Sequence, residues 1–171
     1  ADITLLGKGD EQPDGMAEYE TVLYRHSIAN YCRNAALNAL FGHYREMADA
    51  AGIQTDWNIE LPEPLPFAEL DMTGLFGNLM ENAIAGCLTV PESSRYFCLT
   101  SQVRHGNQLY IVSTNSFDGK VRKGKDGYLS TKRNGNGIGL SAIAATAEKY
   151  GGSAKASNSG TEFFVDIVLK I

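Results

Sequence analysis

Seven residues, Asn134 to Leu140, form the part of the sequence best suited to bind an anion. They read Asn-Gly-Asn-Gly-Ile-Gly-Leu, so glycine stands at every second position. Glycine adopts backbone conformations that other residues avoid, and neighbouring N–H groups can therefore turn toward one anion. A helix that starts directly afterwards adds its unpaired N–H groups and the positive end of its dipole. The pattern indicates a phosphate-binding loop, and taken alone it also fits a flexible loop without a ligand.

A helix is predicted directly after these glycines, over 140–150. Apolar or small side chains recur there every three or four residues, as one face of a helix requires, at Leu140, Ile143, Ala144, Ala147 and Tyr150. Gly151 and Gly152 follow, and glycine commonly ends a helix. The helix is therefore expected to hold the glycine loop at its N-terminal end.

Two asparagines and a glycine, Asn78, Asn82 and Gly86, form a second group. Their spacing of four places them along one stripe of a helix whose other positions are mostly apolar. Asparagine is a poor helix former, and burying it without a partner costs free energy. Its carbonyl oxygen suits Mg²⁺, an ion that keeps several waters and bridges nucleotide phosphates. The alternative is that both amides only bond to neighbouring backbone groups.

Composition limits the classes of protein to be considered. The chain has 171 residues and is 43% apolar, which is enough for one well-buried core. Its net charge of −5 is spread along the chain and argues against a nucleic-acid-binding surface. Cys32, Cys87 and Cys98 lack the spacing of a disulfide framework or a zinc site, and the last two are expected to be buried thiols in a reducing compartment. No run of 18 apolar residues and no signal peptide occurs, so these residues are not expected to enter a membrane.

The remaining elements must position the two groups. Residues 1–15 are rich in glycine and polar residues and are predicted to be a flexible tail, followed by a single domain over 16–171. The elements predicted for this domain are helix 16–51 (one helix, or two with a junction at Asn34), strand 53–61, connector 62–66, a helix ending near 88, strands 95–104 and 108–115, loop 116–133, helix 140–150, and strands 153–157 and 161–169 with a turn at 158–160 between them. Gly52 is expected to end the first helix, and Asp71 or Thr73 to cap the second.

This order of elements predicts the fold class. Helices inserted among mostly antiparallel strands indicate an α+β fold. The expected architecture is a two-layer α/β sandwich, in which a mixed, mostly antiparallel sheet is covered on one face by helices. The strand over 53–61 ends at a proline and is expected to lie at an edge of this sheet.

Three motifs in this order resemble those of the Bergerat-fold (GHKL) ATPases. Asn78-x-x-x-Asn82 is similar to the N box of that superfamily, and Gly135-x-Gly137-x-Gly139-Leu140 resembles its second glycine box. Gly160-Thr161 resembles the Gly-Thr pair of its final strand. The resemblance extends over about residues 25–171. It implies the Bergerat ATP-binding fold, with ATP and Mg²⁺ as cofactors.

Within this superfamily the chain looks most like sensor histidine kinases, in particular the peptide-sensing, quorum-sensing type. Stretches similar to that type are 31–34, 48–53, 115–119 and 130–132. Asn78 stands where gyrase-type and chaperone ATPases place the glutamate that activates water. Glu81 lies one residue before Asn82 and about 100° round the helix, so it is expected to be a solvated or ion-paired residue first and a base second.

The resemblance also implies roles for single residues. Asn82 is expected to hold Mg²⁺ and Asn78 to support the metal or phosphate shell; Asn78, Glu81 and Lys132 are the catalytic candidates. The remaining expected nucleotide contacts are Lys132 and Arg133 to the phosphates, the backbone of Gly135, Gly137, Ile138, Gly139 and Leu140 around the phosphates, and Asn115 and Thr161 to adenine. Most of the superfamily reads adenine with an aspartate in an Asp-x-Gly-x-Gly box, whereas this chain has Asn115 and no glycine pair. An asparagine can still accept from the 6-amino group and donate to a ring nitrogen.

The activity implied is transfer of the γ-phosphate of ATP to a histidine on a dimerisation domain of the same protein, with a response regulator downstream. The chain is then expected to be cytoplasmic, as part of a membrane-bound sensor, and inactive in autophosphorylation without that domain. His26, His43 and His105 are expected to be structural. Two alternatives remain: a nucleotide-free pseudokinase that serves as an interaction module, which the missing Asp-x-Gly-x-Gly box favours, and an anti-sigma-type serine kinase.

Overall fold

The computed structural model describes residues 30–124, 127–129 and 138–171, without the side chains of 122–138. Residues Tyr31–Ile171 form one compact unit. The prediction of a tail over 1–15 and the first part of the helix predicted from residue 16 lie outside the described residues, and His26 lies there too. No helix in the described part of the chain is both long enough and apolar enough to cross a membrane.

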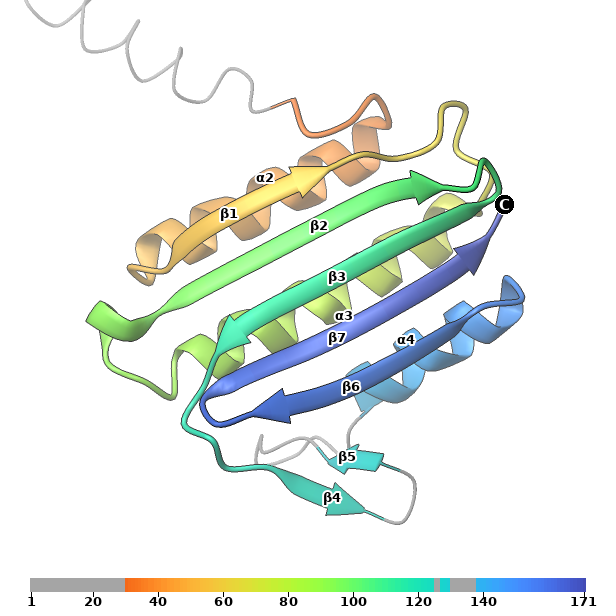
Figure 1. Ribbon diagram of the computed structural model, residues 1–171. Helices are drawn as coiled ribbons and strands as arrows, with labels where there is room; N and C mark the ends of the chain where they lie inside the picture. Colours follow the sequence, from red (N-terminus) through yellow and green to blue (C-terminus); the bar gives the residue numbers. More distant parts are fainter. Residues whose placement is uncertain (1–29, 125–126, 130–137) are drawn as a thin grey trace, which may run out of the picture. The chain divides into compact units, whose positions relative to one another are not determined.

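A five-stranded sheet with the order β1-β2-β3-β7-β6 forms one layer (Figure 1). The strands are β1 (Gln54–Ile59), β2 (Tyr96–Arg104), β3 (Gln108–Ser116), β6 (Ser153–Ser159) and β7 (Glu162–Lys170). β1 pairs with β2 in parallel, and the other neighbours are antiparallel. The mixed, mostly antiparallel sheet and the place of β1 at its edge are as predicted.

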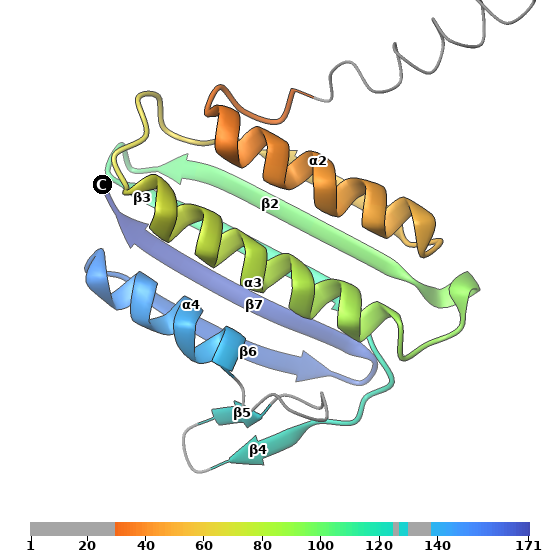
Figure 2. The ribbon, with the colours of Figure 1, turned by 180° about the vertical axis from the view of Figure 1, so that it is seen from behind.

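Three helices cover one face of this sheet (Figure 2). They are α2 (Ala35–Ala50), α3 (Glu69–Cys87) and α4 (Ile138–Lys149), and α3 lies between the other two. Nine residues of α3 are buried, and they pack between the sheet and the flanking helices as the centre of the core. The predicted two-layer architecture is confirmed, and α3 is the element around which the other two helices are arranged.

Local details differ from the predicted elements at several places. Within the described residues the first helix begins only at Ala35, because Asn34 is its N-cap and accepts a hydrogen bond from Leu37 N (2.9 Å). Gly52 follows this helix with a φ of +65°, as expected for a residue that ends it. The loop predicted over 116–133 contains a short hairpin, β4 (Arg122–Gly124) and β5 (Gly127–Leu129), whose strands are too short to show a periodic pattern. β6 continues to Ser159, so the turn before β7 lies at Gly160 and Thr161 instead of 158–160.

The predicted caps of α3 are wrong. The helix begins at Glu69 with Ala68 at the N-cap, and no side chain of its own caps it. Asp71 lies in the first turn and binds the side chains of Lys149 and Tyr150 at the end of α4 instead. Thr73 donates to Leu70 O inside the helix (3.1 Å).

The prediction for the cysteines is confirmed for Cys87 and wrong for Cys98. All three cysteines are free, and Cys87 is buried as predicted. Cys98 is only partly buried, because its neighbours Phe97 and Leu99 take the face of β2 that the helices cover. His43 is exposed on α2, and His105 lies in the turn between β2 and β3 with a φ of +54°.

Candidate nucleotide-binding site

The amide of Asn82 meets the start of α4 at Gly139. A Cβ added to Gly139 would lie 3.1 Å from Asn82 Nδ2 and 3.3 Å from Oδ1, so only glycine fits here without displacing the amide. Asn82 Nδ2 is buried and has no hydrogen-bond partner among the described residues. The N box and the second glycine box, which are far apart in the sequence, therefore come into contact through these two residues.

Asn78 lies one turn before Asn82 on α3 and is half-buried. Of the glycine-box residues, Leu140 packs against the core, and Ile138 begins α4. Lys132, Arg133, Gly135 and Gly137 lie outside the described residues, so the contacts predicted for them stay predictions.

A second contact joins Gly86 of α3 to Asn115 at the end of β3. Asn115 is only 3% exposed, and its Nδ2 donates to Ser116 O at 2.9 Å. A Cβ on Gly86 would lie 2.4 Å from this Nδ2 and 3.3 Å from Ser116 O. The missing side chain of Gly86 therefore makes the room that the Asn115 amide occupies, and the bond to Ser116 fixes how that amide is turned.

Thr161 lies in the turn between β6 and β7 at the same end of the sheet. Its carbonyl oxygen accepts a hydrogen bond from Phe117 N at 2.9 Å, directly after the strand that carries Asn115. The Thr161 residue is exposed. Thr161 is therefore bonded to the chain two residues beyond Asn115.

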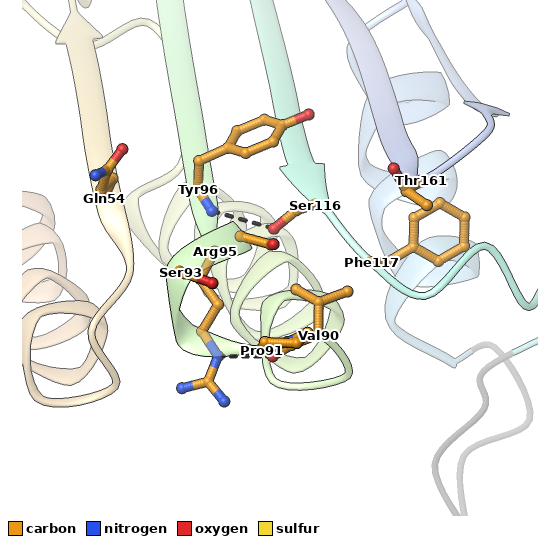
Figure 3. A pocket seen from close by; sticks show the side chains of 10 residues that line it. Gln54, Val90, Pro91, Ser93, Arg95, Tyr96, Ser116, Phe117 and Thr161 are labelled. Atoms are coloured by element: carbon orange, nitrogen blue, oxygen red, sulfur yellow. Dashed lines mark hydrogen bonds between the residues drawn. The ribbon is translucent and has the colours of Figure 1, made fainter.

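A pocket of about 400 Å³ opens at this end of the sheet (Figure 3). It is lined by Gln54, Val90, Pro91, Ser93, Ser94, Arg95, Tyr96, Ser116, Phe117 and Thr161. The guanidinium of Arg95 donates to Val90 O (3.0 Å) and Ala51 O (2.7 Å), so it holds the connection between α3 and β2. Of the residues predicted to bind the nucleotide, only Thr161 lines this pocket. Ser116, whose carbonyl oxygen accepts from Asn115 Nδ2, lines it too.

Glu81 lies on the other flank of α3, toward α2. Its carboxylate accepts a hydrogen bond from the Tyr44 hydroxyl at 3.1 Å. Burial first, and then the hydrogen bond and charge of Glu81, raise the pKa of Tyr44 to about 12. Asn82, by contrast, faces α4. Glu81 is exposed, which agrees with a solvated residue, and its use as a base stays a prediction.

Replacing Glu81 with glutamine is therefore expected to leave the affinity for Mg·ATP within about twofold of wild type. Glutamine keeps an acceptor for Tyr44, and the side chain is turned away from the glycine box. Isothermal titration calorimetry would measure this, with the melting temperature recorded beside it. A loss of affinity of about tenfold would instead assign Glu81 to the site.

The N-terminal end of α3 is joined to the C-terminal end of α4 by a group that the sequence did not reveal. Asp71 Oδ2 accepts from Lys149 Nζ (2.7 Å) and from the Tyr150 hydroxyl (2.5 Å). These two donors, Lys149 first, hold the pKa of Asp71 below its usual value, and the pKa of Lys149 is raised. The interaction is therefore present at neutral pH. It is lost as the pH falls through the lowered pKa of Asp71, or rises through the raised pKa of Lys149.

Comparisons with known proteins identify the class. The model of the GHKL domain family matches residues 67–170, and the chain belongs to this family. No curated protein sequence matches the chain.

Solved structures with this fold include histidine kinase catalytic domains. The catalytic domain of histidine kinase ThkA aligns with a TM-score of 0.57 and 16% identity, covering 80% of this chain and 92% of that one. The Acinetobacter baumannii histidine kinase AdeS aligns with a TM-score of 0.58 and 14% identity, covering 95% and 87%. Full-length ShkA in complex with AMPPNP aligns with a TM-score of 0.52 and 17% identity, covering 78% of this chain and 30% of that one. At these identities the likeness establishes the fold, which is that of histidine kinase catalytic domains.

Proposed function

We propose that the chain is the ATP-binding catalytic domain of a sensor histidine kinase, which presents Mg·ATP so that its γ-phosphate passes to a histidine on a dimerisation domain. The observation that carries this proposal is the contact between Asn82 and Gly139, since it joins the amide suited to a metal to the loop suited to phosphates. Family membership and the fold shared with histidine kinase catalytic domains support it.

The side chains at this contact fit a magnesium ion. The described residues contain no cluster of three or more His, Cys, Asp or Glu side chains that could hold a metal. Mg²⁺ does not need one, because it is usually held by one or two protein oxygens together with substrate phosphates and waters. Asn82 Oδ1 would supply the protein oxygen, and its buried Nδ2 could donate to a phosphate oxygen. The ion would neutralise charge on the β- and γ-phosphates.

The protein's own part in phosphoryl transfer is mostly positioning. In this proposal the backbone from Gly135 to Leu140 holds the phosphates at the positive end of α4. Asn78 supports the metal or phosphate shell, and Lys132 and Arg133 neutralise phosphate charge. No residue of this domain needs to act as a hydrolytic base, in agreement with the amide at Asn78 and with the orientation of Glu81 toward Tyr44.

Adenine is proposed to bind at Asn115 and Thr161. The Asn115 amide donates one hydrogen bond, from Nδ2 to Ser116 O, and its Oδ1 is left as an acceptor for an exocyclic amine. An adenine 6-amino group donates to such an acceptor, whereas a 6-oxo purine cannot. The site is therefore expected to prefer adenine over guanine nucleotides.

The partners and the place in the cell follow from the same proposal. They are the histidine-bearing dimerisation domain and a response regulator, with the domain on the cytoplasmic side of a membrane-bound sensor of the peptide-sensing type. No nucleic-acid partner is proposed. Resemblance of the stretches 31–34 and 115–119 to that type supports the assignment.

The test of this proposal is calorimetric titration of Mg·ATP into the protein and into Asn82→Ala. Wild type is expected to bind in the micromolar to sub-millimolar range, about 5 to 8 kcal/mol of binding free energy. Asn82→Ala is expected to weaken binding at least about tenfold, because the side chain that holds the metal is lost.

The outcome also separates the alternatives. No heat at millimolar ATP, from protein with a cooperative melting transition, would contradict the kinase proposal and favour a nucleotide-free interaction module. Binding followed by transfer to a serine of a small protein, with no transfer to a histidine-bearing helix, would favour the serine kinase.

A further inference from the structure

The start of α3 is completed by the side chain of Tyr150, the residue directly after α4. Ala68 occupies the N-cap, where it cannot supply a side-chain acceptor. Its N–H donates to the hydroxyl of Tyr150 at 3.0 Å, and the same hydroxyl donates to Asp71 Oδ2 at 2.5 Å. Asp71 stands three residues after the N-cap, where the acidic residue of a capping box normally reaches back to the N-cap N–H. Here the Tyr150 hydroxyl bridges these two groups.

Other contacts hold Tyr150 in this position. Its ring packs edge-on against Phe67, with centroids 4.9 Å apart. Lys149 binds the same carboxylate oxygen of Asp71 at 2.7 Å. An acidic residue in the first turn of one helix and a basic residue in the last turn of its antiparallel neighbour both suit the helix dipoles. We call Asp71, Lys149 and Tyr150 the α3–α4 clamp.

The clamp and the nucleotide site lie at opposite ends of the same pair of helices. Asn82 follows Asp71 by 11 residues, and Gly139 precedes Tyr150 by 11 residues. At a rise of about 1.5 Å per residue, both separations are roughly 16 Å. Fixing Asp71 against Tyr150 therefore fixes which residue of α4 lies opposite Asn82. The fit at that end is tight, since a Cβ on Gly139 would lie 3.1 Å from Asn82 Nδ2.

We propose that Asp71 and Tyr150 are positioning residues of the nucleotide site: they set the register of α4 along α3, and thereby the place of Gly139, in the first turn of α4, relative to the Asn82 amide. The inference rests on the proposed function, because it assigns these residues to the phosphate part of that site. It adds a determinant of phosphate binding at the far end of α4, without any contact to the nucleotide.

Two tyrosine-to-phenylalanine variants test this inference with matched chemistry. Tyr150→Phe keeps the ring against Phe67 and removes both hydrogen bonds of the hydroxyl. Tyr44→Phe removes a hydroxyl that is also bound to a carboxylate, that of Glu81, on the flank of α3 that faces α2. Glu81 directly precedes Asn82, so this control lies near the site. Affinity for Mg·ATP is measured by calorimetry at a temperature where melting curves show each protein fully folded.

Tyr150→Phe is expected to weaken Mg·ATP binding by about five- to tenfold, and Tyr44→Phe to stay within about twofold of wild type. A merely structural role would lower the melting temperature of both variants and the affinity of neither. The inference is overturned if Tyr150→Phe binds like wild type, or if Tyr44→Phe loses as much affinity. If Tyr150→Phe does not fold, Asp71→Asn decides by the same criterion. Failure of wild type to bind Mg·ATP would instead remove the proposed function itself.

Discussion

Gly86→Ala is expected to weaken ATP binding by about tenfold or more, roughly 1.4 kcal/mol, in a protein that still folds. The new methyl group would lie 2.4 Å from Asn115 Nδ2, closer than carbon and nitrogen can approach. Because Nδ2 is at the end of the Asn115 side chain, the amide can turn away from the methyl group. Its hydrogen bond to Ser116 O is then lost. The helix itself does not oppose the change, because alanine has the higher helix propensity.

The loss is expected to fall on base recognition. Calorimetry with ATP and GTP should show the preference for ATP shrinking in Gly86→Ala, since a turned Asn115 no longer offers its carbonyl oxygen to the 6-amino group. Gly74→Ala is the matched control, because it lies on the same helix with nothing within 4 Å of the new methyl group. Gly74→Ala should bind like wild type and melt at the same or a higher temperature. Unchanged ATP affinity in Gly86→Ala, with the fold intact, would remove Asn115 from the base site.

Much of the fold could be predicted because its signals are local. The helix after the glycine box is confirmed, since its apolar spacing and the glycine that ends it are both visible in the sequence. In the structure Gly151 has a φ of +65°. The β2–β3 hairpin is confirmed for the same reason, with His105 and Gly106 both at positive φ. The fold class followed from the order of such elements, which is the same whatever distant residues they contact.

The start of α3 could not be predicted, because its cap comes from a residue far along the chain. Asp71 looked like a capping residue by type, yet its partner Tyr150 is 79 residues away. A sequence pattern detects side chains that bond within a turn or two of helix. It does not detect a hydroxyl that arrives from another helix, and so the clamp was missed together with the true first residue of α3.

The candidate site was predictable in part for a similar reason. Asn78, Asn82 and Gly86 all lie on α3, so the stripe expected from their spacing follows from the helix alone, whatever surrounds it. The spacing of these residues does not tell which flank of α3 faces α4. That flank became visible only through the opposite directions of two neighbours: Asn82 toward Gly139 and Glu81 toward Tyr44. Similarly, the pairing of Gly86 with Asn115 depends on how α3 crosses the end of β3.

Gly152→Ala is expected to have the largest effect on stability. A Cβ at this position would lie 1.7 Å from Val168 O and 2.6 Å from the carbonyl carbon of Val168. These atoms belong to the backbone of β7, which pairs with both β3 and β6 and cannot turn aside as a side chain can. Overpacking of a core usually costs 1–3 kcal/mol, and a collision with paired backbone is expected to cost about 3 kcal/mol or more. Urea unfolding would measure this loss.

Gly42→Ala is the control for Gly152→Ala, since nothing lies within 4 Å of its new methyl group and helix propensity favours it. An equal urea midpoint for Gly152→Ala and wild type would show that the α4–β6 junction can relax, contrary to the packing described.

The effect of Gly152→Ala should also reach the nucleotide site. Gly152 fixes the end of α4 against β7. Two residues earlier, the backbone carbonyl of Tyr150 accepts a hydrogen bond from Lys170 N (2.9 Å). Ligand binding stabilises only the folded state. If the displaced junction also moves α4, saturating Mg·ATP should therefore raise the urea midpoint of Gly152→Ala less than that of wild type. Equal increases would separate the stability of this junction from the register of α4.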